Sequence, residues 1–329
     1  MRPAEDVTVV DCSGVGPGGI TRVLTEVVRH WPAGHRLRLV AVPPAWSPPA
    51  DVAILSRQAG GRSRTIASAT ATLRRESAGA ARVLSLSPSL AIAASRRPVV
   101  TVVHDLAFRL WPAGLPAAVR GYRRLSYATA VRRSARLLCV SARTRHDLAG
   151  LYGVDADVWY PGSDVTGPGR APAAVEALDS YLVVPGHAPH KGVELAIEAL
   201  PLLPAQHLVI LAGGRDVPRS DRVIVLDHLG DAEYAATIAG AAAVVMPSHF
   251  EGYGLPAVEA LRLGTPVVVS PDPALLEATG GQAVRMTSWT APALAEAVAV
   301  ALAGPRPPAG HSGRTWAEAT RDLVSLLCA

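Results

Sequence analysis

The sequence predicts an α/β protein built from two doubly wound, parallel-sheet domains in tandem. Its 329 residues are long for one hydrophobic core and comfortable for two domains. Short runs rich in Val and Leu alternate with longer helical patterns, which is typical of a parallel sheet covered on both faces. The alternation pauses at 159–180, a segment rich in Pro, Gly and small residues, and then restarts. We therefore expect an N-terminal domain over 1–165 and a C-terminal domain over 176–312.

The first half shows the alternation from its start. Strands are expected at 7–12, 36–42, 82–87, 99–105 and 136–141. A Gly-rich turn and a helix over 20–31 follow the first strand, and a long helical pattern spans about 116–134. Residues 43–81 show no clear long element, so we expect a loop-rich region there.

The second half repeats the pattern. Strands are expected at 181–186, 207–214, 222–228, 242–248 and 265–270, and helices at 191–203, 231–240, 255–263 and 291–304. A Pro-rich joint at 305–309 precedes a last helix. In doubly wound sheets, ligands bind beyond the carboxyl ends of the strands. With two such sheets, we expect the site in the cleft between the domains.

Composition narrows the class of partner. The formal charge of +5 is compatible with nucleic acid, an anionic membrane surface or an anionic small substrate. The sequence has neither zinc-finger spacing nor aromatic residues interleaved with basic ones, so we expect no nucleic-acid partner. The cysteines Cys12, Cys139 and Cys328 lie far apart, which indicates no disulfide framework and fits a reducing cytoplasm. We expect no signal peptide and no membrane-spanning segment.

A glycine motif near the N-terminus suggests one alternative function. Gly14, Gly16 and Gly19 have the G-x-G-x-x-G spacing of dinucleotide-binding proteins, after an expected strand and before an expected helix. A ribose-binding acid should follow about 20 residues later, yet none appears until Asp51. An NAD-type dinucleotide-dependent oxidoreductase therefore stays open as an alternative. The other interpretation is a tight turn that lets backbone approach a ligand or domain, with helix amides that could face an anion.

The stretch 247–270, "PSHFEGYGLPAVEALRLGTPVVVS", carries the strongest chemical signal. An expected strand ends here, a turn with glycines follows, and Pro256 fits the first turn of a helix. Turn amides and a helix N-terminus make an anion site. Glu251 and Glu259 flank this site, and carboxylates there suit the hydroxyls of a sugar–diphosphate–nucleoside. Taken singly, Glu259 could complement the helix dipole and Glu251 could be a solvated loop residue.

The same stretch resembles the E-x7-E signature of the retaining family-4 glycosyltransferases (glycosyl transferases group 1), which have the GT-B fold. Glu251 and Glu259 have the required spacing, with "EGYGLP" between them and "EALRLGTPVV" after. "VVHDLAF" (102–108), "VSARTRHDL" (140–148) and "TWAEAT" resemble further family segments. The resemblance implies two Rossmann-like domains facing across a cleft, the C-terminal one binding the nucleotide sugar. It also implies that the C-terminal helix, 313–329, packs back on the first domain.

Residue roles follow from this resemblance. Lys191 is the single lysine of the chain and falls on the family's diphosphate-binding lysine, so it would neutralise the leaving nucleotide. Glu251 would position the donor sugar, Glu259 the ribose, and His104 would lie near the transferred sugar. Asp105 would orient His104 or its loop. The remaining donor-binding residues would be Gly252, Tyr253, Gly254, Leu255 and the first-domain turn with Gly18 and Gly19.

One family feature is missing. Many relatives carry an arginine five or six residues before the lysine, where this chain has Pro185 and Gly186. His187 and Arg215 are the candidates to replace it in donor binding.

The implied function is retaining sugar transfer from a nucleotide-diphosphate sugar to a natural product, glycan or lipid-linked sugar by a front-face mechanism. A non-catalytic glycosyltransferase-like protein of the same fold is a further alternative. The loop carboxylates Asp155 and Asp157 lack a third ligand nearby, so we predict no metal and no cofactor. The basic helix over 120–138 could make weak peripheral contact with an anionic membrane. We expect a cytoplasmic protein.

Overall fold

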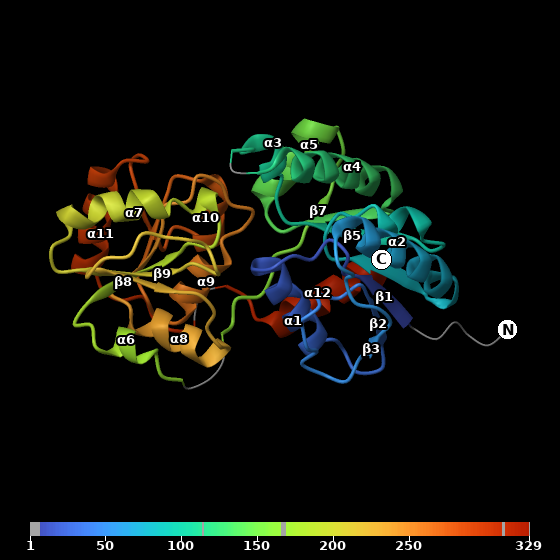
Figure 1. Ribbon diagram of the computed structural model, residues 1–329, viewed down its shortest axis with the longest axis horizontal. Helices are drawn as coiled ribbons and strands as arrows, with labels where there is room; N and C mark the ends of the chain where they lie inside the picture. The colour runs from blue at the N-terminus through green and yellow to red at the C-terminus, as the bar shows by residue number, and fades with distance from the viewer. Residues whose placement is uncertain (1–6, 114, 166–168, 311–312, 329) are drawn as a thin grey trace. The chain divides into compact units, whose positions relative to one another are not determined.

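The computed structural model describes residues 7–113, 115–165, 169–310 and 313–328. These residues form two compact units (Figure 1). The first contains the described residues up to Gly162 together with the C-terminal segment from Thr315, and the second runs from Ser163 to Arg314. Residues 1–6 of the predicted first domain and residue 329 of the predicted last helix lie outside the described residues.

The first unit contains a seven-stranded parallel sheet with the order β3-β2-β1-β4-β5-β6-β7. Its strands are β1 (Val7–Asp11), β2 (Arg36–Val40), β3 (Ala53–Ile54), β4 (Arg82–Ser85), β5 (Val99–Val103), β6 (Arg136–Cys139) and β7 (Asp157–Val158). The five predicted strands are confirmed, while β3 and β7 have two residues each and are too short to leave a pattern. The chain runs from β1 to β3 on one side and then returns to β4, so the topological switch point lies between β1 and β4.

The helices of the first unit are α1 (Gly19–Arg29), α2 (Arg62–Glu76), α3 (Ala107–Leu110), α4 (Ala117–Arg133), α5 (Ala142–Tyr152) and α12 (Trp316–Cys328). Two short 3-10 helices, η1 (Ser77–Gly79) and η2 (Ala91–Ala94), complete the set. The prediction of a loop-rich region over 43–81 is wrong, because α2 has 15 residues there. This helix is rich in Arg, Ser, Thr and Ala and buries only four of its residues, so it lacks the apolar stripe that a periodicity search detects.

The last helix, α12, packs on the first unit, as the resemblance implies. The indole Nε1 of Trp159 donates to the carbonyl of Ala319 at 2.8 Å, and Arg136 donates to the carbonyl of Leu326 at 2.7 Å. Trp316, at the start of α12, is fully buried. A Cβ at Gly162 would collide with the backbone of Trp316, so the chain can leave the first unit beside this helix only with glycine at that position.

The second unit contains a six-stranded parallel sheet with the order β10-β9-β8-β11-β12-β13. Its strands are β8 (Tyr181–Pro185), β9 (His207–Leu211), β10 (Val223–Leu226), β11 (Ala243–Met246), β12 (Val267–Val269) and β13 (Val284–Arg285). The chain moves outward from β8 to β10 and then restarts on the other side of β8 with β11. The switch point therefore lies between β8 and β11, where the register pairs Val183 with Val244.

Helices cover both faces of this second sheet. They are α6 (Ala173–Glu176), α7 (Val193–Ala199), α8 (Asp231–Gly240), α9 (Leu255–Arg262), α10 (Pro273–Thr279) and α11 (Ala291–Ala303), with 3-10 turns η3 (Pro189–Lys191) and η4 (Leu200–Leu202). The predicted helix 191–203 is thus divided into η3, α7 and η4, since Pro201 interrupts regular helix near its end. The other predicted helices of this half are confirmed within a residue or two.

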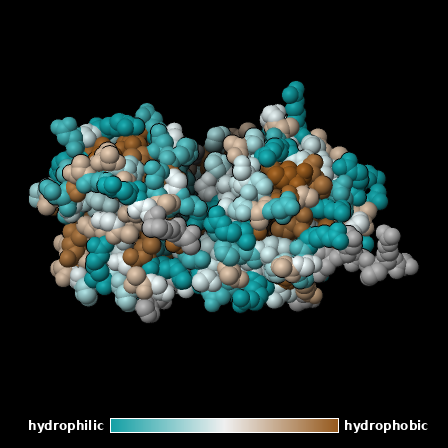
Figure 2. Space-filling model, turned by 90° about the horizontal axis from the view of Figure 1, so that it is seen from below, coloured by the Kyte–Doolittle hydropathy of each residue, from teal (hydrophilic) through white to brown (hydrophobic). Residues whose placement is uncertain are grey.

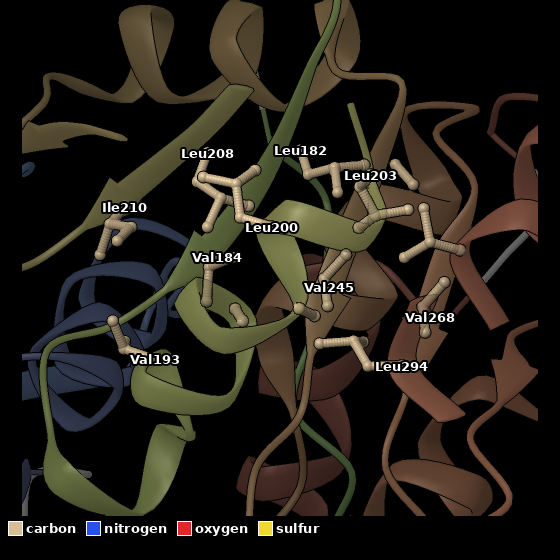
Figure 3. Packing of buried hydrophobic residues seen from close by; sticks show 14 of the residues in the cluster. Leu182, Val184, Val193, Leu200, Leu203, Leu208, Ile210, Val245, Val268 and Leu294 are labelled. Carbon is tan, nitrogen blue, oxygen red and sulfur yellow. The ribbon is translucent and has the colours of Figure 1, made fainter. Parts of the chain in front are cut away.

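Strands β8, β11 and β12 of the second sheet are buried along their whole length, and the side chains of β8 alternate between two cores. Leu182 and Val184 of β8 point to one face, where they pack with Leu200 and Leu294 (Figure 3). Val183, the residue between them, packs in the other core with residues of α8, α9 and α10. This double burial explains why the strand reads as a continuous apolar run.

The surface carries scattered apolar groups. On the face shown in Figure 2, hydrophobic residues form groups set among hydrophilic ones in each unit. Among the described residues, no helix combines the length and the hydropathy that crossing a bilayer requires.

Candidate active site

Two loops meet at the carboxyl edge of the second sheet, one after β8 and one after β11. The backbone N–H of His249 in the second loop donates to the carbonyl of His190 in the first at 2.8 Å. Gly192 follows η3 with a φ of 70°, and a Cβ there would collide with the carbonyl of Pro247. Only glycine allows this approach. The loops that carry Lys191 and Glu251 are therefore held together by backbone contacts at the switch point.

Lys191 and Glu251 form a buried ion pair. The ammonium Nζ lies 2.7 Å from Oε1 and 2.9 Å from Oε2 of the carboxylate. Each side chain is only 6% exposed. Burial by itself raises the pKa of Glu251, but the charge and hydrogen bonds of Lys191, with help from His190 and Ser248, outweigh it and the pKa lies below its ordinary value. The pair is thus ionised and desolvated together.

Asp272 holds the backbone of Glu251. Its side chain is the N-cap of α10, where Oδ1 accepts the N–H of Ala274 at 2.9 Å, and Oδ2 accepts the N–H of Glu251 at 3.3 Å. Asp272 is 2% exposed. Sequence reasoning missed this residue, although "SPDPALLE" has the Asp-Pro pattern of a helix N-terminus. Nothing in that pattern points to Glu251.

Glu259 lies in the first turns of α9 and is 4% exposed. Its Oε2 accepts a hydrogen bond from the hydroxyl of Tyr234 at 2.6 Å. Gly254, with a φ of 104°, caps the start of the helix, and a Cβ there would press on the side chain of Leu275. The predicted donor-binding residues of this turn thus lie together at the start of α9: Gly252, Tyr253, Gly254 and Leu255. Tyr234 was not predicted.

Arg215 and His187 lie beside the loop after β8. Arg215 donates to the carbonyls of Gly186 and Ala188 at 3.4 and 3.5 Å and pairs with Glu194, so it props the loop. Local desolvation of the imidazole and, second, the charge of Lys191 lower the pKa of His187 to about 4. The imidazole is therefore neutral at pH 7 and offers a hydrogen bond without a positive charge.

His104 lies at the carboxyl edge of the first sheet, directly after β5. Its Nε2 donates to the carbonyl of Leu86 at 2.8 Å, which leaves Nδ1 as a hydrogen-bond acceptor. Burial lowers the pKa of His104, and the bond to Leu86 and the charge of Asp105 offset this only in part. Asp105 Oδ1 accepts the N–H of Ala107 at 2.9 Å, so its carboxylate orients the loop. His104 is a neutral acceptor of hydrogen bonds.

The Gly-rich turn of the first unit follows β1, one of the two strands that border the switch point of that sheet. Gly18, with a φ of 94°, precedes α1, and Gly19 is the first residue of that helix. A Cβ at Gly14 would lie 3.1 Å from Ser87 in the loop after β4. Close packing thus accounts for Gly14 and backbone conformation for Gly18, whereas a Cβ at Gly16 would meet open space. Asp11, at the end of β1, is fully buried and accepts hydrogen bonds from Ser85, Ser89 and the backbone of Ser13.

The two carboxylates of the "DAD" segment are engaged by arginines. Asp155 pairs with Arg145 at 3.0 Å and Asp157 with Arg136 at 3.2 Å. Asp157 belongs to β7, which corrects the expectation that both residues lie in a loop. Within the described ranges, no three His, Cys, Asp or Glu side chains gather as a metal-binding group.

Family models match most of the chain. The model of "Glycosyltransferase Family 4" matches residues 17–166, and that of "Glycosyl transferases group 1" matches residues 179–303. A glycogen synthase of Thioalkalivibrio sulfidiphilus is 32% identical in an alignment 235 residues long, which covers 53% of this chain and 49% of that protein. The chain spans about half the length, or less, of the first curated relatives it matches.

Solved structures share the fold. Sucrose-phosphate synthase from Thermosynechococcus elongatus has a TM-score of 0.67 at 19% identity, over 98% of this chain and 94% of that one. Anabaena HepE in complex with UDP and glucose has a TM-score of 0.68 at 17% identity, over 98% and 95%. Two Rossmann-like units, matched by the models of the two domains in turn, place the chain in a known family. It belongs to the group 1, family 4 glycosyltransferases of the GT-B fold.

Proposed function

We propose that this chain is a retaining glycosyltransferase that moves a sugar from a nucleotide-diphosphate sugar to a hydroxyl-bearing acceptor without a metal. The observation that carries the proposal is the Lys191–Glu251 pair at the switch point of the second sheet, together with the buried Glu259 of α9, the helix that follows the loop of Glu251. A cation, two carboxylates and a helix N-terminus match the three parts of such a donor: diphosphate, sugar and ribose.

The diphosphate would lie against Lys191 and the amides at the start of α9. The ammonium is a compact charge that is already desolvated, so it stabilises negative charge on the leaving phosphate without waiting for solvent to reorganise. Arg215 would keep the loop before Lys191 in place through the carbonyls of Gly186 and Ala188. The neutral His187 would donate a hydrogen bond to a phosphate oxygen or accept one from a hydroxyl of the sugar nucleotide.

The carboxylates would hold hydroxyl groups. Glu251 would accept from the hydroxyls of the donor sugar, and Glu259 from those of the ribose. The fixed Nδ1 of His104 would accept from a hydroxyl of the transferred sugar, a role that needs the neutral imidazole. The turn with Gly18 and Gly19 would contribute backbone N–H groups to the donor.

Transfer would take place on one face of the sugar. The bond between the anomeric carbon and the phosphate oxygen breaks, and the acceptor oxygen forms its bond to the same face. The acceptor proton passes to the leaving phosphate oxygen, which carries away the electron pair of the broken bond. Neither an enzyme nucleophile nor a metal enters these steps. The anomeric configuration is therefore retained.

Two observations favour this function over the alternatives. After β2 ends at Val40, the chain continues with Ala41 and Val42 and presents no carboxylate for the ribose of NAD. The buried complementary charges of Lys191 and Glu251 would be costly to keep in a protein without a polar ligand. The relatives also include proteins named as mannosyltransferases, and one solved structure of the same fold contains UDP and glucose.

A panel of UDP-, GDP-, ADP- and dTDP-sugars tests the proposal through release of the nucleoside diphosphate. We expect turnover with one base, and NMR of the product should show the anomeric configuration of the donor. Glu251→Gln should lower the rate at least about a hundredfold. Full turnover in that variant, or inversion at the anomeric carbon, would contradict the assignment.

The N-terminal domain, to which the family resemblance assigns the acceptor, carries a basic helix. The helix α4 carries Arg120, Arg124 and Arg132, and its Leu125 is 62% exposed. We propose that this helix makes weak peripheral contact with anionic lipid, and that the enzyme is cytoplasmic. Flotation with anionic and neutral liposomes at low salt tests this contact. We expect the wild type to bind only the anionic vesicles and the variant Arg120→Glu/Arg124→Glu to bind neither. Equal recovery of the protein on anionic and neutral vesicles would refute the contact.

A further inference from the structure

Tyr234 contacts one of the two carboxylates of the candidate site. Its hydroxyl lies 2.6 Å from Oε2 of Glu259. The residue occupies the first turn of α8, where its backbone N–H donates to the carbonyl of Gly230 at 2.8 Å. Its ring packs half-buried against the core between the sheet and α8, α9 and α10. The phenol is thus fixed at its base by the helix, along its ring by packing and at its tip by Glu259.

The contact ties together two helices that are separate in the sequence. Glu259 is 4% exposed, and a carboxylate buried to this degree needs hydrogen-bond donors to remain ionised. An O–H···O⁻ bond of this length is of the strong, charge-assisted kind. It also restricts the rotation of the carboxylate plane, because one of its oxygens must stay on the phenol. The tyrosine therefore determines how Glu259 presents its oxygens.

We propose that Tyr234 is a positioning residue that orients Glu259 toward the ribose, so that the site prefers ribonucleoside over 2′-deoxyribonucleoside diphosphates. The inference rests on the proposed function, in which Glu259 binds the ribose. A carboxylate whose orientation is fixed can match two neighbouring hydroxyls at once. A ribose that lacks the 2′-hydroxyl leaves one of those hydrogen bonds unmade, which a site built to make it discriminates against strongly.

A purely structural role for the phenol makes a different prediction. If Tyr234 only satisfied a buried carboxylate, its loss would lower the melting temperature and leave the preference for ribose unchanged. Tyr181 offers a matched control, because its hydroxyl donates to the carbonyl of Thr237 in the same helix α8 at 3.0 Å. Tyr181→Phe removes a tyrosine hydroxyl that anchors α8 without touching Glu259.

Calorimetric titration of UDP, GDP and ADP, each against its 2′-deoxy counterpart, tests the inference. We expect the wild type to bind its ribonucleotide at least about tenfold more tightly than the deoxy form. Tyr234→Phe should reduce that ratio to about threefold or less, and Tyr181→Phe should keep it. In turnover, Tyr234→Phe should raise KM for the sugar nucleotide while kcat stays within about twofold, since only binding of the ribose is loosened.

Glu259→Gln keeps the experiment decisive if Tyr234→Phe is unstable. Glu259→Gln alone should abolish the preference, and the double variant should show no further loss, because both changes act through one contact. A tenfold preference that persists in Tyr234→Phe overturns the inference and leaves the proposed function intact. A wild type that binds ribo- and deoxynucleotides equally also overturns the inference and leaves the proposed function intact. A wild type that binds dTDP but none of the three ribonucleotides overturns the inference and leaves the proposed function intact. A wild type that binds neither the ribonucleotides nor dTDP defeats the proposed function, and the inference with it.

Discussion

The ammonium of Lys191 lies within 2.9 Å of both carboxylate oxygens of Glu251, and both side chains are almost completely shielded from water. The two residues are 60 positions apart in the sequence. They come from the loops that follow β8 and β11, the two strands on either side of the switch point. The single lysine of the chain is thus a direct partner of the first glutamate of the E-x7-E pattern.

This pairing predicts an asymmetric effect of mutation on stability. Lys191→Ala leaves a buried, unpaired carboxylate and should lower the free energy of unfolding by about 3–5 kcal/mol. Lys191→Met/Glu251→Gln removes both charges and should cost clearly less. Urea unfolding measures both, with Arg170→Ala as a control, since the Arg170–Glu176 pair is largely exposed. A double variant as unstable as Lys191→Ala would show that the charges are not coupled.

The same pair predicts how stability depends on pH. The folded-state pKa of Glu251 is below its ordinary value of about 4.3, so the unfolded chain binds more protons between the two pKa values. The stability from this group is therefore complete above the ordinary value and is lost as the pH falls through the folded pKa. We expect the free energy of unfolding to fall more steeply below pH ~4.5 in the wild type than in Glu251→Gln. Parallel curves for the two proteins would rule out this contribution.

His104 predicts an effect on the rate in the acidic range. Its lowered pKa keeps more of the imidazole neutral at pH 6.5 than an ordinary histidine would have, so the transfer rate should fall less between pH 7.5 and 6.5 than protonation at the usual value of about 6.5 would cause. His104→Ala should lower kcat by about tenfold to a hundredfold, because one hydrogen bond to the reacting sugar is lost. A pH–rate profile of kcat with an acidic limb centred at 6.5 would contradict the neutral assignment.

Much of the fold could be predicted from periodicity. The inner strands β1, β5, β8, β11 and β12 are apolar or nearly apolar runs that are buried along their whole length, and the helices 231–240 and 291–304 carry clear boundaries. The helix α2 could not be predicted in this way, because three of its four buried residues, Thr65, Ala69 and Thr72, are small or polar. Burial of small side chains depends on close approach in the fold, which the sequence pattern does not contain.

The candidate site was predictable where one stretch of chain builds it. Glu251, Gly254 and Glu259 lie along a single strand–turn–helix segment, so their spacing carries the signal. The contacts that orient them come from elsewhere. Tyr234 reaches Glu259 from α8, and Asp272 reaches the backbone of Glu251 from α10. Such pairings arise from the packing of neighbouring helices, so only the structure identifies them.

The central claim is that Lys191 belongs to a nucleoside-diphosphate site. Thermal-shift titration of wild type, Lys191→Ala and Arg170→Ala with UDP, GDP, ADP, dTDP and NAD tests it most directly, because a ligand that binds only the folded state raises the melting temperature by mass action. We predict stabilisation by one nucleoside diphosphate in the wild type and in Arg170→Ala, and its loss in Lys191→Ala. Stabilisation by NAD alone, or by a diphosphate that Lys191→Ala binds equally well, would contradict the account.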